Sequence, residues 1–394
     1  MICLNKKVLK DTYTKEEVFE IKHQTILSCT TIFLMVLLAL VLALYAFVVK
    51  LNTNIDLKDT IKIAKILQLY NTEYLGEFDT TEAVDNAIYN IVSVSKDKYG
   101  TYIPAKYQNL SSKIFEGNYT GFGFTLLFDK EAETITIMDI KENSPAHNAN
   151  LQIGQQITLI DNNKITEESY NNFLNNVKEG LAEETEFEID NKFKVVMIPN
   201  IVDMDILKYD IIDNIAYIHI YTFVEKTETL FKEAIDNISN SNIEKIVFDL
   251  RGNTGGNAEV VVSMLDYITK NELIMDSVYA NGEHTDIYAN EENHLSEDIP
   301  IYILCNQKTA SASELFIMCL QDTRNITLIG QQTYGKSTIL TVNLFQDGST
   351  FCFSSGTYYS KRHENIEDKG ITPNIILNDD DIFKKAEELT NFYR

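Results

Sequence analysis

A run of 24 residues without a charged side chain, Ile26–Val49, limits what this chain can be. As a helix, such a run covers the roughly 30 Å of hydrocarbon in a bilayer. The alternative is the apolar core of a cleaved signal peptide, but those cores usually hold about 7–15 residues, and no small-x-small cleavage pattern follows this one cleanly. We therefore expect an uncleaved transmembrane helix over residues 26–49, preceded by a segment 1–25.

Charge indicates how this helix is oriented and which partners are excluded. Five lysines precede the apolar run against four acidic residues, a small excess that favours a cytoplasmic N-terminus. We then expect a single-pass protein of the cell membrane with its large C-terminal part outside the cytoplasm. The chain as a whole carries a formal net charge of −24, which disfavours nucleic acid as a partner. The lysines are Lys6, Lys7, Lys10, Lys15 and Lys22.

Changes in hydrophobic pattern divide the rest of the chain into three regions. Helical spacing of apolar residues predicts a helical region over 50–116. Period-2 alternation and turn residues predict a compact β-rich unit over 117–200. From 201 to 394, apolar strands alternate with helices, which predicts crossover connections and a mainly parallel sheet covered on both faces. The expected fold class is therefore α/β, with a βα core.

Two segments of this core that could carry chemistry follow apolar strands. Arg251–Gly256, RGNTGG, holds three glycines, which permit backbone geometries that side chains forbid. Its amides could bind phosphate or, at Gly255 or Gly256, stabilise the oxyanion of a tetrahedral intermediate. A tight strand-to-helix turn without a ligand explains the motif equally well.

The second segment, Thr309–Asp322, runs from a small-residue turn into an apolar helix. A serine near a helix N-terminus has unpaired amides and a favourable dipole beside it. Ser313, followed by Glu314, fits the N-cap position. Ser311 has no such structural explanation and is the candidate nucleophile.

Lys336 follows a glycine turn in Gly330–Ile339 and enters an apolar strand. Burial would lower the pKa of its amine and leave a neutral base able to accept a serine proton. The alternative is nucleotide binding, because Gly330–Ser337 fits G-x-x-x-x-G-K-[ST]. That loop requires a helix directly after it, whereas Thr338–Phe345 is β-branched and predicts a strand.

Together these segments resemble the carboxyl-terminal processing peptidases, or tail-specific proteases. The family's Ser-Ala-Ser-Ala-Ser-Glu signature corresponds to Thr309–Glu314, and its lysine motif to Thr333–Thr338, which places Lys336 25 residues after Ser311. Asp249–Gly256 is similar to its Asp-Leu-Arg-Gly-Asn-Pro-Gly-Gly turn, and Lys96–Tyr102 to the segment before its PDZ domain. The likeness covers about residues 80–376.

The resemblance implies a serine endopeptidase with a crotonase/ClpP-like βα protease core and a PDZ-like domain. Ser311 and Lys336 would be the catalytic pair, and the amide of Ala312 would complete the oxyanion hole with Gly255 or Gly256. The loop Gly121-Phe122-Gly123-Phe124 would bind the C-terminal carboxylate of protein or peptide substrates. The resemblance also implies dimerisation, and it implies no cofactor.

One departure from the family pattern concerns the position four residues after the lysine. The family commonly has a glutamine there, which orients the lysine amine, and this chain has Leu340. Thr338, on the same strand face as Lys336, is a candidate substitute. Two other functions stay open: a catalytically impaired scaffold that binds peptide tails, and a crotonase-like enzyme acting on acyl thioesters.

The remaining chemistry-bearing residues have ordinary structural explanations. None of the six histidines lies in a motif typical of a catalytic base, although a Ser-His-Asp triad needs no sequence adjacency. No HExxH or clustered Cys/His spacing predicts a metal site. Cys305, Cys319 and Cys352 fit apolar core positions. Asp322, eleven residues after Ser311, has a family counterpart but is expected to be a surface acid at a helix end.

Overall fold

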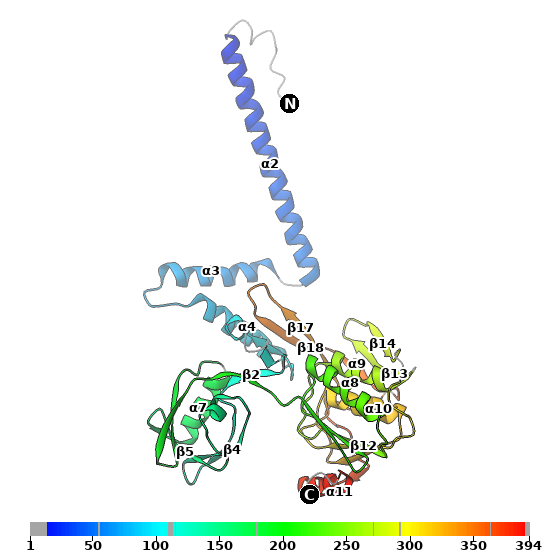
Figure 1. The fold of residues 1–394 in the computed structure, drawn as a ribbon. Coiled ribbons are helices and arrows are strands. Elements are labelled where there is room, and N and C mark those ends of the chain that lie inside the picture. The colour runs from blue at the N-terminus through cyan, green and yellow to red at the C-terminus, as the bar shows by residue number, and fades with distance from the viewer. Residues whose placement is uncertain are drawn as a thin grey trace. The chain divides into compact units, whose positions relative to one another are not determined.

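The computed structural model describes residues 14–53, 56–108, 113–114, 116–178, 180–270, 272–290, 293–362 and 364–390 (Figure 1). Two compact units divide the chain, Met1–Ala87 and Ile88–Arg394. Lys6, Lys7 and Lys10, which support the predicted orientation of the membrane helix, lie outside the described residues.

Helices make up the first unit. Helix α2, Lys15–Thr53, contains a segment, Ile26–Leu44, with a mean hydropathy of 2.7 and no buried side chains. This segment is long and apolar enough to cross a membrane, a property that signal sequences share. Helix α3, Leu57–Glu73, begins at Asp56, whose side chain accepts the Lys58 N–H at 3.1 Å. Helix α4, Thr80–Ser95, follows it.

The predicted β-rich region forms a small antiparallel sheet with its own core. The sheet order is β3-β4-β5-β7-β8, with β6 paired to β5, and β3 lies at one edge. Phe122, Ile137, Ile157 and Phe187 are among the side chains buried in this core. The elements are β2 (Asn118–Gly121), β3 (Phe124–Asp129), β4 (Thr134–Ile140), α6 (Pro145–Asn148), β5 (Gln156–Ile160), β6 (Asn163–Lys164), α7 (Glu167–Lys178), β7 (Thr185–Ile189), β8 (Phe193–Met197) and β9 (Asn200–Asp203).

The sheet of the βα core has the order β10-β11-β12-β15-β16-β19. Only the β10–β11 pair is antiparallel, and the others are parallel, as the alternation of strands and helices predicts. Its strands are β10 (Leu207–Ile212), β11 (Ile215–Ile220), β12 (Lys245–Asp249), β15 (Ile301–Cys305), β16 (Ile326–Gly330) and β19 (Ile375–Ile376).

Helices cover both faces of this sheet. On one face α8 (Glu225–Ser239), α9 (Ala258–Ile268) and α10 (Ala312–Thr323) bury Phe248 of β12 in the main core. On the other face α11 (Asp379–Thr390) packs on Val247 of the same strand. Successive strand residues point to opposite faces, which is why the middle of β12, Ile246 to Phe248, is apolar on both faces.

A second antiparallel sheet has the order β1-β18-β13-β14, with β17 also paired to β18. Strand β1, Thr101–Ile103, comes from the region expected to be helical, and its pairing with β18 explains the difference. This pairing brings the chain around residue 97 to β18. The other strands are β13 (Leu273–Tyr279), β14 (His284–Tyr288), β17 (Thr338–Leu344) and β18 (Thr350–Tyr359).

The cysteines expected in the core are free thiols. Cys305 and Cys319 are buried, and burial raises the pKa of each thiol to about 12. Cys352 is partly buried, and burial again raises its pKa. Because the thiolate is the reactive form, the two buried thiols are poor nucleophiles.

Candidate active site

Ser311 lies at the N-cap of α10 with φ 56° and ψ −119°. A non-glycine residue rarely adopts a positive φ, and such strain is typical of functional sites. The expectation that Ser313 caps the helix was wrong. The Ser313 hydroxyl instead donates to the Asn253 carbonyl at 3.1 Å, which ties the first turn of α10 to the glycine turn.

The glycine turn makes its closest approach to this serine at Gly255. A Cβ atom on Gly255 would lie 2.8 Å from the Ala310 carbonyl oxygen and 3.0 Å from the Ser311 Cβ. With φ +105°, the position also requires a backbone that other residues rarely adopt. The Gly255 N–H donates to Asn253 Oδ1 at 2.9 Å, so this amide already has an acceptor.

The N–H of Gly256 is the other candidate oxyanion donor that the sequence suggested in the glycine turn. Its φ is +144°, and a Cβ there would lie 2.2 Å from the Phe223 carbonyl oxygen. Phe223 is fixed on both sides, because its N–H donates to Gly255 O and its carbonyl accepts the Asn257 N–H. Ala312 begins α10, where an N–H has no partner within the helix. The amides of Gly256 and Ala312 are therefore the better pair of donors for an oxyanion.

Lys336 lies in the loop between β16 and β17, directly after Gly335 with φ +87°. The residues that follow form strand β17, as predicted, so no helix is available to direct its amides at a phosphate. The nucleotide-binding interpretation of Gly330–Ser337 therefore fails. The lysine is half-buried, and burial lowers the pKa of its amine below 10.5.

One buried carboxylate connects Ser311, the candidate nucleophile, with Lys336, the candidate base. Glu314 has no exposed surface, and its Oε2 accepts both the Ser311 N–H at 2.9 Å and the Lys336 N–H at 2.8 Å. Its Oε1 accepts the Gly335 N–H at 2.8 Å and the Thr333 hydroxyl. Burial raises the pKa of Glu314, although these hydrogen bonds act in the opposite direction.

Tyr358 of β18 connects the same two residues through their carbonyl groups. Its phenol oxygen lies 2.8 Å from the Ser311 carbonyl oxygen and 2.7 Å from that of Lys336. The ring is buried, and burial raises the pKa of the phenol well above 10.0, so the hydroxyl stays a donor. Ser311 and Lys336 are thus held together by their N–H groups on one side and their carbonyls on the other.

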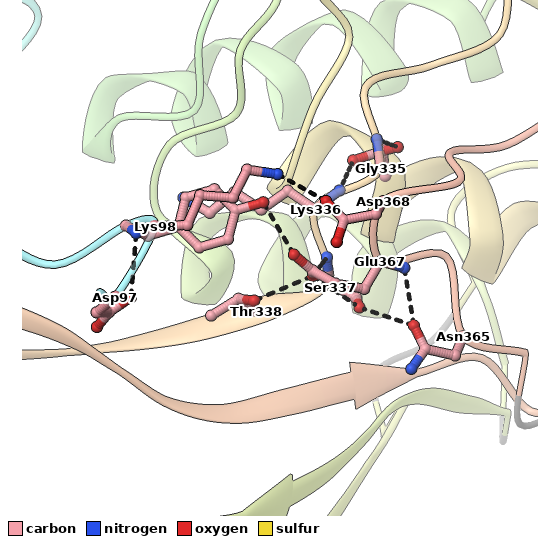
Figure 2. A network of polar contacts seen from close by, with 11 residues as sticks. Asp97, Lys98, Gly335, Lys336, Ser337, Thr338, Asn365, Glu367 and Asp368 are labelled. Atoms are coloured by element: carbon pink, nitrogen blue, oxygen red, sulfur yellow. Dashed lines mark hydrogen bonds and ion pairs between the residues drawn. The ribbon is translucent and has the colours of Figure 1, made fainter. Parts of the chain in front are cut away.

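Thr338, the candidate substitute for the family's glutamine, has a different partner. Its hydroxyl donates to Glu367 Oε2 at 3.0 Å (Figure 2). The Ser337 N–H donates to the same oxygen at 2.8 Å. Thr338 therefore fixes the start of β17 to Glu367, and Leu340 has no polar group to offer.

The side chain of Asp322 is buried, although a surface position was expected. Its side chain is only 4% exposed, and it pairs with Arg362 Nε at 2.9 Å. It also accepts the Lys361 N–H at 2.8 Å. The carboxylate therefore joins the end of α10 to the segment that follows β18.

A buried ion pair lies at the end of β12. Asp249 is fully buried and accepts hydrogen bonds from the Arg251 guanidinium and the Tyr217 hydroxyl. His219, one strand away, stacks on Tyr221 with ring centroids 3.8 Å apart, and burial lowers the pKa of its imidazole. This histidine is a buried, stacked side chain, and its Nε2 accepts no hydrogen bond from Ser311.

The loop Gly121–Phe124 joins β2 to β3 beside an apolar groove. Gly123, with φ +79°, leaves no room for a Cβ, which would lie 2.0 Å from the Ser144 Cβ. Phe122 is buried in the core and accepts the Ala146 N–H at its carbonyl. The groove runs between β3 and α7 and is lined by Tyr119, Gly121, Phe122, Gly123, Phe124, Leu126, Tyr170, Phe173, Leu174 and Val177.

A second polar cluster lies on the β13–β14 hairpin. Asp276, His284 and Asp286 bring potential ligand atoms within 4.8 Å of one another. No sequence motif predicted this cluster, because the pairing of two strands creates it. His284 Nε2 lies 2.6 Å from the buried Asp276 Oδ1.

Sequence reasoning placed Ser311, Lys336 and the glycine turn but missed Asn253, Glu314 and Tyr358 as the residues that hold them. Glu314 was visible only as the acidic residue of a helix cap. Tyr358 lies 47 residues after Ser311, and no local pattern links the two. The pairing of β18 with β17 and β13 brings this tyrosine to the site.

The chain is similar to known peptidases. Residues 214–377 match peptidase family S41. The carboxy-terminal processing protease CtpA of Bacillus subtilis (strain 168) is 27% identical over 321 residues, which are 80% of this chain and 68% of that protein. The carboxy-terminal-processing protease of Bartonella bacilliformis is 25% identical over 336 residues, 83% of this chain and 76% of that protein.

Solved structures share the fold. The photosystem II D1 C-terminal processing protease superposes with a TM-score of 0.51 at 19% identity, covering 80% of this chain and 86% of that one. An S41 protease structure from Bacteroides fragilis NCTC 9343 gives a TM-score of 0.56 at 17% identity, covering 83% and 95%. Residues 214–377 therefore match a family of peptidases, S41, and about four fifths of the chain is similar to carboxy-terminal processing proteases.

Proposed function

We propose that Ser311 and Lys336 are the catalytic pair of a membrane-anchored endopeptidase that recognises the C-terminal tails of its substrates. The observation that carries the catalytic assignment is the single buried oxygen of Glu314 that accepts the N–H groups of both residues. This contact fixes the two backbones beside each other, as a nucleophile and its base require.

The reaction begins with proton transfer from Ser311 to the neutral Lys336 amine. The Ser311 Oγ then attacks the carbonyl carbon of the scissile peptide bond, and the N–H groups of Ala312 and Gly256 stabilise the negative charge on the carbonyl oxygen. Collapse of this intermediate breaks the C–N bond, and the Lys336 ammonium returns its proton to the leaving amine. An ester between Ser311 and the acyl group remains.

Water completes the cycle. The neutral Lys336 amine accepts a proton from the attacking water, and the resulting hydroxide adds to the ester carbonyl. The same amides stabilise the second oxyanion. When the ester breaks, the ammonium protonates the Ser311 oxygen and regenerates the hydroxyl. No cofactor takes part in these steps.

Single substitutions test the pair. Ser311→Ala and Lys336→Ala should each abolish cleavage of a protein substrate, and Lys308→Ala, which changes an exposed lysine close to the nucleophile, should not. A fluorophosphonate probe should label the wild type at Ser311 and fail to label Ser311→Ala. Cleavage at the wild-type rate by either catalytic variant would overturn the assignment.

Tail recognition is proposed for the groove between β3 and α7. Strand β3 is at the edge of its sheet, so an extended peptide can pair with it and direct its terminal carboxylate toward the Gly121–Phe124 loop. The aromatic lining favours an apolar last side chain. Amidation of a substrate's C-terminus should slow its cleavage, and equal rates for the acid and the amide would exclude this recognition.

The membrane anchor is proposed from the apolar part of α2. Ile26–Leu44 should keep the protein in the membrane fraction after carbonate extraction, with the protease core accessible from outside the cytoplasm. The alternative is a cleaved signal sequence. Mass spectrometry of the purified protein separates the two, because cleavage would remove this segment from the N-terminus.

A further inference from the structure

The base of this peptidase has no glutamine to hold its amine, because Leu340 occupies that position. We infer that Tyr99, from the segment just before β1, positions Lys336 instead. The Lys336 Nζ lies over the Tyr99 ring, 4.4 Å from its centroid. At this distance the face of an aromatic ring attracts a cation. Tyr99 is a positioning residue in this inference, and it rests on the proposed role of Lys336 as base.

The ring is fixed by a hydrogen bond to the loop that carries the lysine. The Tyr99 hydroxyl donates to Glu367 Oε1 at 2.9 Å. The other oxygen of Glu367 accepts the N–H of Ser337, the residue directly after Lys336, at 2.8 Å. Figure 2 shows Ser337 and Thr338 converging on this carboxylate. Glu367 therefore connects the tyrosine ring to the backbone beside the lysine.

The segment that carries Tyr99 is itself attached to the second sheet. Asp97 accepts the Ser354 N–H at 2.7 Å and the Ser354 hydroxyl at 2.6 Å. The same carboxylate accepts the Tyr99 N–H at 3.0 Å. Lys98 pairs with Asp368 at 2.7 Å. Asp97, Lys98 and Tyr99 are thus each held by polar contacts, which fix the Tyr99 ring outside any helix or strand.

The charges around the amine act in both directions. Glu367 and Asp97 favour the ammonium form of Lys336, and Lys98 opposes it. Burial outweighs these contributions and lowers the pKa of the amine. Lys98 pairs with Asp368, and its Nζ also lies over the Tyr99 ring, 5.0 Å from the centroid.

The ring matters most during the reaction. Lys336 starts as a neutral amine and becomes an ammonium as it accepts the Ser311 proton. A ring face stabilises the ammonium more than the amine, so its contribution is larger in the transition state than in the ground state. Leu340 has no hydrogen-bond acceptor to orient the Lys336 amine, as a glutamine at this position would. The Tyr99 ring orients the amine instead.

Two substitutions of Tyr99 separate the ring from the hydroxyl. Tyr99→Leu removes the ring, and serine acylation by a fluorophosphonate should become about 2- to 30-fold slower per active site. Tyr99→Phe keeps the ring and should restore the rate to within about 3-fold of the wild type. Tyr288→Leu makes the same change at an exposed tyrosine of β14 and should leave the rate unchanged. Active-site titration corrects each rate for misfolded protein.

Glu367→Gln provides a readout that a purely structural role would not change. The carboxylate raises the pKa of Lys336, so its neutralisation should shift the acidic limb of the acylation rate to lower pH. This measurement remains decisive if Tyr99→Leu does not fold. An unshifted limb, or a Tyr99→Leu rate per active site equal to that of the wild type, would overturn the inference.

Lys336→Met distinguishes failure of this inference from failure of the proposed mechanism. If Lys336→Met acylates at the wild-type rate, the lysine is not the base and the mechanism itself is wrong. If Lys336→Met is inactive while Tyr99→Leu is fully active, the lysine is the base and only the role of Tyr99 is lost.

Discussion

Replacing Glu314 by glutamine should damage both stability and catalysis. The carboxylate has no exposed surface and accepts four hydrogen bonds, two at each oxygen. Glutamine offers one acceptor oxygen, so two buried donors lose their partner and face an NH2 group. At about 1–3 kcal/mol for each unsatisfied donor, the free energy of unfolding should fall by about 2–6 kcal/mol. That is a large part of the stability of a typical domain.

The catalytic effect of Glu314→Gln depends on which oxygen is lost. If the amide replaces Oε2, the N–H groups of Ser311 and Lys336 are released together, and kcat should fall with little change in KM. Urea unfolding and pre-steady-state acylation measure the two effects separately. Glu259→Gln, the same change at an exposed first-turn position of α9, is the control. A Glu314→Gln protein as stable and as active as this control would refute the idea of a carboxylate bridge.

Three further predictions follow from the site. Tyr358→Phe removes the donor shared by the carbonyls of Ser311 and Lys336 and should cost about 1–3 kcal/mol in urea unfolding together with a loss of kcat. Gly256→Ala places a Cβ 2.2 Å from the Phe223 carbonyl oxygen and should abolish acylation, measured with the fluorophosphonate probe. The value of kcat/KM should rise with pH as Lys336 loses its proton. The apparent pKa of this rise should lie below 10.5, because burial lowers the pKa of the amine. A pH profile without such a rise would contradict the role of Lys336 as base.

Local sequence patterns predicted much of the fold. The alternation of apolar strands and helices predicted the parallel sheet, and the β-branched residues after Lys336 predicted strand β17. Strand β1 was missed because Thr101–Ile103 is short and its pairing with β18 is a long-range event. Hydrophobic periodicity indicates whether a segment is a helix or a strand and which face is buried. It does not indicate which distant segment pairs with it.

The site divides in the same way. Ser311 and Lys336 were predicted because each lies in a compact motif, but the residues that hold them come from distant parts of the chain. Tyr99 and Glu367, for example, are 268 positions apart and meet through one hydrogen bond. A sequence motif records the residues that react, and the contacts that orient them depend on strand pairing that the motif does not encode.

Leu340→Gln tests whether the Lys336 amine needs a second group to orient it. If the Tyr99 ring already orients Lys336, a glutamine at 340 should change the acylation rate of the wild type by less than about 3-fold. The same glutamine should rescue Tyr99→Leu, because an amide oxygen would then take over the orientation of the amine. The double-mutant cycle should therefore show strong coupling between positions 99 and 340. Equal acceleration by Leu340→Gln in both backgrounds would mean that the two residues act independently, and that the ring does not replace the glutamine.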